Sequence, residues 1–307
     1  MLIKKNNSFS SSLSVLFIVF LFVTLTISIN VPIQPELNVP VPKPFSLDTA
    51  FSHLLYSYAT YCSPLKVVNW TCEYCSFKEI NPQLKVTAIL ENVSTNTFGF
   101  IGYSQLNQTI VMAFRGTQMA SLQNWITNLN FPKTEPYPKF PSALVHSGFL
   151  SAYQGVKSQV ESGLNYTQEL CPSCDRLIIT GHSLGGALAI LAATDVYESG
   201  LTTLPLEMYT FGSPRLGNVA FAEYFETTIS KNLYRLVNDH DLVPHLPPMD
   251  LNFHHLPIEV WFNTTSVPLD YYVCNSSGED PNCSDSLTVA LNIPQHLDYL
   301  GIEKALC

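Results

Sequence analysis

The sequence predicts an α/β fold in which helices flank a central, mostly parallel sheet. Strand-like apolar runs alternate with helical patterns in the second half of the chain; the runs are 176–180, 206–211 and 233–237, and the helical patterns are 149–170, 185–197 and 218–229. This alternation is typical of parallel strands joined by crossover helices. The 307 residues contain no internal repeat, and 46% of them are hydrophobic, so we expect one large domain with a sizeable core.

The first half of the predicted domain begins with a helix and an antiparallel meander. Ser46 fits as the helix cap, and apolar side chains follow it at helical spacing: Ala50, Leu54, Tyr58 and Tyr61. Three strand-like runs separated by turn residues come next, at 85–90, 98–103 and 109–114.

Gly181-His182-Ser183-Leu184-Gly185 fits the pattern G-x-S-x-G, between the apolar run 176–180 and a small, apolar helical segment. Strand, sharp turn and helix in this order predict a nucleophile elbow rather than a chance glycine-rich turn. The glycines are needed because a Cβ there would clash with the crossing helix and strand. The corner presents the Ser183 hydroxyl above the sheet edge, and the helix N-terminus adds positive potential near any oxyanion.

A base and an orienting acid are available downstream of Ser183. Asp239 and Asp241 both follow the run 233–237, and position alone does not separate them. His296 follows both, although His254 and His255 are also downstream. Serine, aspartate and histidine in this chain order are typical of the α/β-hydrolase fold.

Phe114-Arg115-Gly116-Thr117 ends the third strand-like run, where a second oxyanion donor is expected; an ordinary strand-to-loop turn is the alternative. Residues 121–131 then carry apolar side chains at i, i+3, i+4 and i+7, namely Leu122, Trp125, Ile126 and Leu129. This stripe is typical of a helix docked on the core. Its position directly after the candidate oxyanion turn favours a mobile lid over an apolar groove.

Lys4 and Lys5 precede an apolar run, which predicts a signal peptide over residues 1–29. A proline-rich segment, 30–45, follows as a pro-segment or tether, and the domain spans 46–307. The apolar run is shorter than the roughly 20 residues that a spanning helix prefers, so an uncleaved signal anchor is the less favoured alternative. The formal net charge of −9, with 13% charged residues, excludes a nucleic-acid-binding surface.

The cysteine content fits a secreted or lumenal protein. The eight cysteines are Cys62, Cys72, Cys75, Cys171, Cys174, Cys274, Cys283 and Cys307. Two C-x-x-C pairs raise zinc as an alternative, but they lie far apart in sequence, and the signal peptide favours disulfides. Seven N-x-S/T sequons predict glycosylation, at Asn69, Asn92, Asn107, Asn165, Asn263, Asn275 and Asn282. The sequence shows no cofactor motif.

Seven short motifs together resemble a known family. They are FRGT, QNWITNLNF, VHSGFL, GHSLGGALA, YTFGSPRLGN, NDHDLVPHLPP and HLDYLGI, and they occur in the family's order. On these residues the chain resembles, over 46–307, the class 3 lipases typified by the secreted triacylglycerol lipases of filamentous fungi. The resemblance implies a catalytic triad of Ser183, Asp241 and His296. It also implies oxyanion donors at Thr117 and at the N–H of Leu184, with the helix around Trp125 as the lid.

The resemblance carries further expectations. It implies the disulfides Cys62–Cys307, Cys72–Cys75 and Cys274–Cys283, which leaves Cys171 and Cys174 to pair with each other. It implies an acyl groove lined by Tyr61, His182, Val243, Leu246 and Pro247. The chain departs from the family at Gln123 and Asn128, where family lids often carry an arginine and an aspartate, so a charged latch for the open lid is not expected. Thr117 replaces a frequent serine.

The expected function is therefore that of a secreted, monomeric carboxylic-ester hydrolase, foremost a triacylglycerol lipase. Its partners would be a lipid or ester substrate and, through the lid, a lipid–water interface. A phospholipase A1 or a feruloyl-type esterase on the same scaffold is the alternative within the enzyme class. A non-catalytic lipid-binding glycoprotein would lack a triad member, and none is missing. No metal or other cofactor is expected.

Overall fold

The computed structural model describes residues 44–77, 83–230, 232–263, 270–287, 292–304 and 307. The predicted signal peptide lies outside the described residues, as does the proline-rich segment up to residue 43. Within the described part of the chain, no helix is both long and apolar enough to cross a membrane. All elements below belong to one compact unit, residues 38–307.

Eight strands of the described chain form one sheet in the order β1-β2-β3-β6-β7-β8-β9-β10. The neighbouring strands from β3 to β9 are parallel, whereas β1, β2 and β10 are antiparallel to their neighbours. The bounds are β1 Lys85–Asn92, β2 Thr97–Ser104, β3 Thr109–Phe114, β6 Arg176–His182, β7 Leu206–Phe211, β8 Leu233–Asn238, β9 Glu259–Phe262 and β10 Tyr271–Val273. Short ladders pair β4 Lys133–Thr134 with β5 Val145–His146, and β11 Asp298–Tyr299 with β12 Ile302–Glu303. The predicted meander and central parallel sheet are confirmed.

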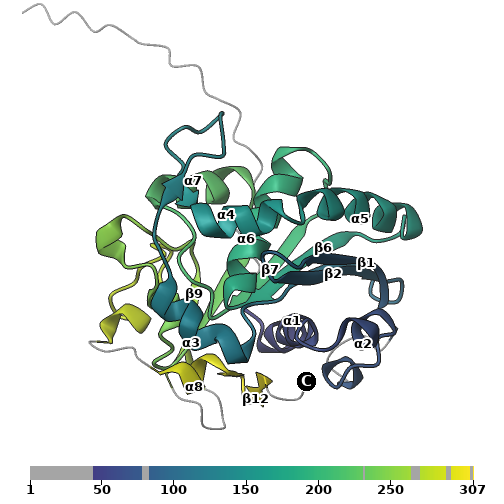
Figure 1. Cartoon of the computed structure of the whole chain (residues 1–307), viewed down its shortest axis with the longest axis horizontal. Helices are drawn as coiled ribbons and strands as arrows, with labels where there is room; N and C mark the ends of the chain where they lie inside the picture. Colours follow the sequence, from purple (N-terminus) through teal and green to yellow (C-terminus); the bar gives the residue numbers. More distant parts are fainter. Residues whose placement is uncertain (1–43, 78–82, 231, 264–269, 288–291, 305–306) are drawn as a thin grey trace, which may run out of the picture. The chain divides into compact units, whose positions relative to one another are not determined.

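Helices cover both faces of this sheet (Figure 1). Side chains alternate along each strand, so Val111 and Ala113 of β3 face α1, whereas Ile110 and Met112 face the layer that contains α4 to α7. The helices are α1 Leu47–Ala59, α2 Pro64–Val68, α3 Met119–Asn128, α4 Ser147–Gln154, α5 Lys157–Leu170, α6 Leu184–Glu198, α7 Val219–Thr228 and α8 Ile293–His296. Short 3₁₀ helices lie at Tyr74–Ser76, Val243–His245, Met249–Leu251 and Ser284–Ser286.

The parallel register brings the predicted functional segments to one edge. Phe114, at the end of β3, pairs with Gly181 of the elbow, and His182 pairs with Phe211 at the end of β7. β8 runs parallel to β7 and ends at Asn238, three residues before Asp241. The carboxyl ends of three strands therefore deliver the oxyanion turn, the elbow and the acid to the same place.

The expected helix over 149–170 is wrong in one respect, because the structure divides it into α4 and α5 at Gly155 and Val156. The Gly155 carbonyl accepts a hydrogen bond from Asn92 Nδ2 at 3.0 Å. A Cβ on Gly155 would lie 2.6 Å from that nitrogen. The break lets α4 pack against α6 while α5 packs against β1 and β2.

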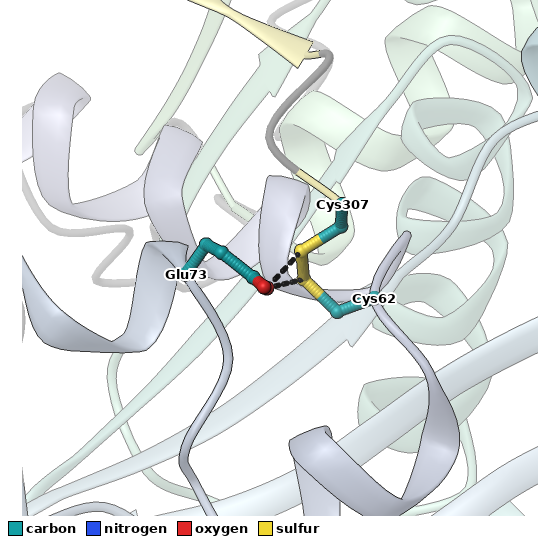
Figure 2. Close-up of side chains that lie close together, drawn as sticks. All are labelled: Cys62, Glu73 and Cys307. Atoms are coloured by element: carbon teal, nitrogen blue, oxygen red, sulfur yellow. Dashed lines mark hydrogen bonds between the residues drawn. A yellow bond between two sulfur atoms is a disulfide. The ribbon is translucent and has the colours of Figure 1, made fainter.

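All eight cysteines form disulfides, with the pairing Cys62–Cys307, Cys72–Cys75, Cys171–Cys174 and Cys274–Cys283. These are the pairs that the family resemblance implies, and neither C-x-x-C pair offers thiolates to zinc. Figure 2 shows the Glu73 carboxylate against the Cys62–Cys307 bridge, with Oε2 2.9 Å from the Cys307 sulfur. This grouping resembles a metal site in outline, but its sulfurs are already bonded to each other.

The Cys62–Cys307 disulfide should be a large contributor to stability, because it joins residues 245 positions apart. A cross-link over a long loop removes more entropy from the unfolded chain than one over a short loop. We expect the double variant Cys62→Ala/Cys307→Ala to lose about 3–5 kcal/mol of unfolding free energy in denaturant titrations. The matched control, Cys72→Ala/Cys75→Ala, removes a bridge of separation 3 and should lose about 1–2 kcal/mol. Equal losses would contradict this account.

Candidate active site

The elbow at Ser183 has the strained geometry that its sequence predicts. Ser183 has φ 60° and ψ −135°, a backbone conformation that residues other than glycine rarely adopt. The turn needs glycine on both sides. A Cβ on Gly181 would lie 2.1 Å from the Gly185 carbonyl oxygen, and one on Gly185 would lie 2.2 Å from the Phe114 carbonyl oxygen. Close packing of β3, β6 and α6 thus holds Ser183 at the end of its strand.

Asp241 and His296 form a buried pair at the same edge. His296 Nδ1 lies 2.8 Å from Asp241 Oδ2 and 3.0 Å from Oδ1, and both side chains are fully buried. The carboxylate also accepts the backbone N–H of Val243 at 2.9 Å and the hydroxyl of Tyr299 at 2.6 Å. Both oxygens of the carboxylate therefore accept hydrogen bonds, and His296 Nδ1 is the protonated ring nitrogen that donates to them.

The competing acid and bases have other partners. Asp239 is partly exposed, and its carboxylate contacts His240 and Gln295. His254 Nε2 lies 2.8 Å from the Ser277 carbonyl oxygen, and His255 Nε2 lies 2.8 Å from that of Pro244. Of the candidates left open by sequence position, Asp241 and His296 are the two that meet.

Ser183 Oγ and His296 Nε2 are both buried, and neither has a hydrogen-bond partner among the described residues. Both residues lie against the end of β7: the Ser183 N–H donates to the Phe211 carbonyl at 2.8 Å, and a Cβ on Gly212 would lie 2.8 Å from His296 Cε1. Buried polar atoms without partners are rare in folded proteins, because each forgoes the hydrogen bonds it made in water. Two of them at one strand edge mark a site whose bonds form with a substrate, and catalytic hydrogen bonds commonly tighten only then.

Tyr61 and His182 form a hydrogen-bonded chain next to His296. His182 Nε2 lies 2.7 Å from the His296 carbonyl oxygen, so this nitrogen carries the proton. Nδ1 then accepts from the Tyr61 hydroxyl at 2.8 Å, and that hydroxyl accepts the Gly116 N–H at 3.0 Å. Burial lowers the pKa of His182 well below its usual value, which keeps the ring neutral. One chain of hydrogen bonds thus joins Gly116, in the expected oxyanion turn, to His296, the expected base.

The two expected oxyanion residues, Thr117 and Leu184, line one cavity of about 410 Å³ together with Trp125 and Asn128 of the α3 region. Leu184 is the first residue of α6, so its N–H has no acceptor within the helix. The N-terminal end of the helix also carries partial positive charge. A carbonyl oxygen placed in this cavity would meet a donor-rich wall beside Ser183.

The helix expected to act as the lid is present as α3, with its apolar stripe turned toward the domain, and its role as a lid stays a prediction. Leu122 is buried, and Trp125, Ile126 and Leu129 are half-buried. Trp125 stacks on Phe149 with ring centroids 6.2 Å apart. Beneath it lies a second cavity, of about 490 Å³, lined by Trp125, Leu129, Phe149 and Leu184 among others. Because Ser183 has no exposed surface, a substrate reaches it only after some covering segment moves.

The five expected groove residues stay a prediction, and the structure places several of them in the interior. His182 and Val243 are fully buried, and both nitrogens of His182 are already hydrogen-bonded. Leu246 and Pro247 are held by Arg215, whose N–H donates to the Leu246 carbonyl and whose guanidinium donates to that of Pro247. Arg215 in turn pairs with Glu279 through two contacts of 2.8 Å.

Sequence reasoning missed two groups at the site, Tyr299 and Lys304. Tyr299 lies within the HLDYLGI motif, but nothing in that motif shows that its hydroxyl reaches Asp241 across 58 positions. Lys304 is a single lysine near the end of the chain, and its ammonium donates to the Thr117 carbonyl at 3.3 Å. Both contacts depend on how β11 and β12 fold back, which no local pattern encodes.

Tyr299→Phe should weaken the acid–base pair without changing its composition. Loss of a hydrogen bond to a charged group costs about 1.5–3 kcal/mol, so we expect kcat for ester hydrolysis to fall about tenfold or more at unchanged KM. Tyr166→Phe, at an exposed tyrosine, is the control and should match the wild type. Steady-state kinetics on a soluble ester measure both, and a wild-type kcat for Tyr299→Phe would contradict the contact's importance.

Comparison with known proteins agrees with this geometry. The family model described as Lipase (class 3) matches residues 111–251. The chain is 36% identical to a lipase of Rhizomucor miehei over 251 residues, which covers 81% of this chain and 67% of the relative. It is 34% identical to a lipase of Rhizopus oryzae over 80% of this chain and 62% of that protein. The chain thus spans roughly two thirds of the length of these curated relatives.

Solved structures give the same result. A Rhizomucor miehei triacylglyceride lipase superposes with a TM-score of 0.74 at 34% identity, covering 85% of this chain and 95% of the other. A lipase from Rhizopus microsporus var. chinensis gives 0.76 at 32% identity, with 89% and 96% covered. A further structure, at 0.76 and 34%, is described as a triacylglycerol lipase whose catalytic centre is a serine protease triad. By sequence and by fold, this chain belongs to the class 3 lipase family.

Proposed function

We propose that this protein is a secreted serine carboxylic-ester hydrolase that acts on triacylglycerols at lipid–water interfaces. The observation that carries the proposal is the buried Asp241–His296 pair beside the unpaired hydroxyl of Ser183, beneath an apolar helix. A serine hydroxyl is a weak nucleophile unless an adjacent base accepts its proton. The homologues are named lipases, and one solved neighbour is described as a triacylglycerol lipase with a serine protease triad.

The proposed reaction begins when Ser183 Oγ attacks the ester carbonyl carbon and its proton passes to His296 Nε2. The carbonyl oxygen becomes an oxyanion that accepts from the Leu184 N–H and from Thr117. Asp241 holds the imidazole and stabilises the imidazolium. His296 then gives the proton to the departing alcohol, which leaves an acyl group on Ser183. Water, deprotonated by the same imidazole, then attacks the acyl carbon. The bond between that carbon and Ser183 Oγ breaks, the imidazolium returns the proton to Oγ, and the fatty acid leaves.

The lid supports a preference for aggregated substrates. Closed, α3 buries Leu122 and part of Trp125, and its outer face carries uncharged polar side chains such as Gln123 and Asn124. Opening in water would expose the apolar stripe, which is unfavourable, whereas opening against lipid would bury it again. Substrate access would therefore depend on the presence of an interface.

A substrate panel tests the proposal, using emulsified triolein, phosphatidylcholine vesicles and a soluble short-chain ester. We expect the highest turnover on triolein, with a sharp rise once the oil forms droplets. Trp125→Ala should reduce that rise more than it reduces hydrolysis of the soluble ester, because Trp125 lies on the lid's apolar stripe as well as on the wall of the cavity beside Ser183. Preference for phosphatidylcholine would point to a phospholipase, and no hydrolysis of any ester would refute the proposal.

Secretion is part of the proposal. Four disulfides fit an oxidising compartment, and relatives at 29–31% identity are named secreted mono- and diacylglycerol lipases. Five of the seven sequon asparagines are exposed: Asn69, Asn107, Asn165, Asn275 and Asn282. Asn92 is half-buried, and its amide nitrogen donates to the Gly155 carbonyl. Glycopeptide mass spectrometry would show whether the exposed asparagines carry glycans and whether Asn92 lacks one. All three triad residues come from one chain, so the enzyme is proposed to act as a monomer.

A further inference from the structure

Lys304 is a buried lysine that the proposed reaction does not use. Its side chain is 5% exposed, although an ammonium group is strongly hydrated in water. The ammonium donates to the Thr117 carbonyl oxygen at 3.3 Å and lies 3.8 Å from the centre of the Tyr61 ring. Burying a charge is costly unless its partners compensate, so a lysine kept in this position calls for a specific reason.

The segment that carries Lys304 is anchored at several points. Its backbone N–H donates to the Leu297 carbonyl at 2.9 Å, and the preceding Glu303 carbonyl accepts the Tyr74 hydroxyl at 2.8 Å. Three residues later, Cys307 forms the disulfide with Cys62 (Figure 2). Lys304 therefore reaches Thr117 from a fixed support.

Thr117 needs such a support because of where it lies in the chain. It is an expected oxyanion donor, and the lid helix begins only two residues later, at Met119. A moving lid would pull on this turn. Tyr61 already holds one side of the turn through the Gly116 N–H at 3.0 Å, and Lys304, stacked on the same ring, holds the other side through the Thr117 carbonyl.

We propose that Lys304 is a positioning residue of the oxyanion turn: its ammonium keeps Thr117 aimed at the developing oxyanion while the lid moves, and adds positive potential there. The inference rests on the proposed ester hydrolysis. Lys304 also lines a cavity of about 410 Å³ with Met119 and Leu297, so the same ammonium lies beside the start of the lid. Charge held in a site of low dielectric acts more strongly than it would in water.

The charge on Lys304 should titrate in the neutral range. Burial, and then the Arg115 guanidinium, lower the pKa of Lys304 to about 7. The other titratable groups around it are Tyr61, His182, Asp298 and Glu303. Burial raises the pKa of Tyr61 and lowers that of His182, so both are neutral there. The ammonium is present below about pH 7 and is lost as the pH rises, so its help to catalysis declines in that direction.

Lys304→Met tests the proposal, because it keeps the length of the side chain and removes the charge. Loss of one direct oxyanion donor costs about 10²–10³ in kcat, so loss of a group that positions a donor should cost about tenfold. We expect this fall in kcat on a soluble ester at pH 6.5, with KM unchanged. The kcat of the wild type should fall to a lower plateau as the pH rises through about 7, and the kcat of Lys304→Met should lack that step.

Two further variants separate positioning from packing. Lys304→Arg keeps a cation that does not titrate, so it should retain most of kcat and lack the step near pH 7. Lys133→Met is the matched control: this lysine also donates to a carbonyl, that of Leu251 at 2.6 Å, and lies 4.2 Å from the Phe253 ring centre. Its contacts are with Leu251 and Phe253 rather than with Thr117 or Tyr61, so the variant should keep the wild-type kcat and pH profile on the soluble ester.

The outcomes distinguish this inference from the proposed function. A wild-type enzyme that hydrolyses no ester overturns both. An active wild type with an unchanged kcat and pH profile in Lys304→Met overturns the role of Lys304 alone. If the Lys304 variants do not fold, the wild type decides by the direction of its pH profile: a kcat on the soluble ester that falls to a lower plateau between about pH 6.5 and 9 supports the inference, and a kcat that stays flat or only rises, as loss of the proton from a general base would produce, overturns it.

Discussion

Ser183→Ala should lower kcat for ester hydrolysis by about 10⁶ and abolish covalent labelling by an organophosphate. Without Oγ no acyl-enzyme forms, and only binding and oxyanion stabilisation remain. The variant should be at least as stable as the wild type, because the lost hydroxyl is buried and makes no hydrogen bond within the described chain. Thermal unfolding of the same samples therefore separates lost chemistry from lost structure.

Ser57→Ala provides the control for this experiment. Ser57 is also fully buried, but its hydroxyl bonds the His53 carbonyl at 3.0 Å and the Thr180 hydroxyl at 2.8 Å. Its removal should cost about 1 kcal/mol of unfolding free energy and leave labelling intact. Ser183→Ala is thus expected to lose labelling and keep its stability, whereas Ser57→Ala is expected to lose stability and keep its labelling. Labelling that persists in Ser183→Ala would place the nucleophile elsewhere.

Asp241→Asn should lower kcat by about 10⁴, although the change replaces one oxygen with an amide nitrogen. The carboxylate accepts from His296 Nδ1, the Val243 N–H and the Tyr299 hydroxyl, and it fixes the tautomer that leaves Nε2 free to accept a proton. An amide group presents a donor to the same imidazole and favours the wrong tautomer.

Asp239→Asn is the matched control for the acid, since both residues follow β8 and position alone does not separate them. The Asp239 carboxylate faces His240 and Gln295 at a partly exposed corner. We expect a kcat within a few fold of the wild type on the same soluble ester. Similar losses in both aspartate variants would mean that the loop geometry, rather than the Asp241 carboxylate, limits the reaction.

The elements that sequence predicted well are those with a strong local period or a demanding turn. The β-branched run before Gly181 and the small residues after Ser183 predict a strand and a helix, and β6 and α6 follow within a residue or two. The apolar stripe around Trp125 predicts the lid helix, which begins at Met119 rather than Ser121. In each of these cases the information lies within about one turn of helix or one strand.

The features that sequence did not predict depend on distant partners. α4 ends at Gly155, where the side chain of Asn92, from the end of β1, occupies the space that a side chain on residue 155 would need. The buried ion pair of Arg235 in β8 and Glu259 in β9, at 3.0 Å, joins these two strands, and the alternation of apolar and polar residues in the sequence does not predict it. Asp241 was separable from Asp239 only by the family resemblance or by the fold itself.

Much of the site is assembled from one short stretch far downstream of Ser183: His296, the Tyr299 hydroxyl and the Lys304 ammonium all lie between residues 296 and 304. During synthesis the sheet and the Ser183 elbow leave the ribosome before these residues do, because His296 follows Ser183 by more than a hundred positions. A nascent chain that still lacks the base is then expected to be inert toward esters. A ribosome-bound chain that stops before Ile293 should not react with an organophosphate.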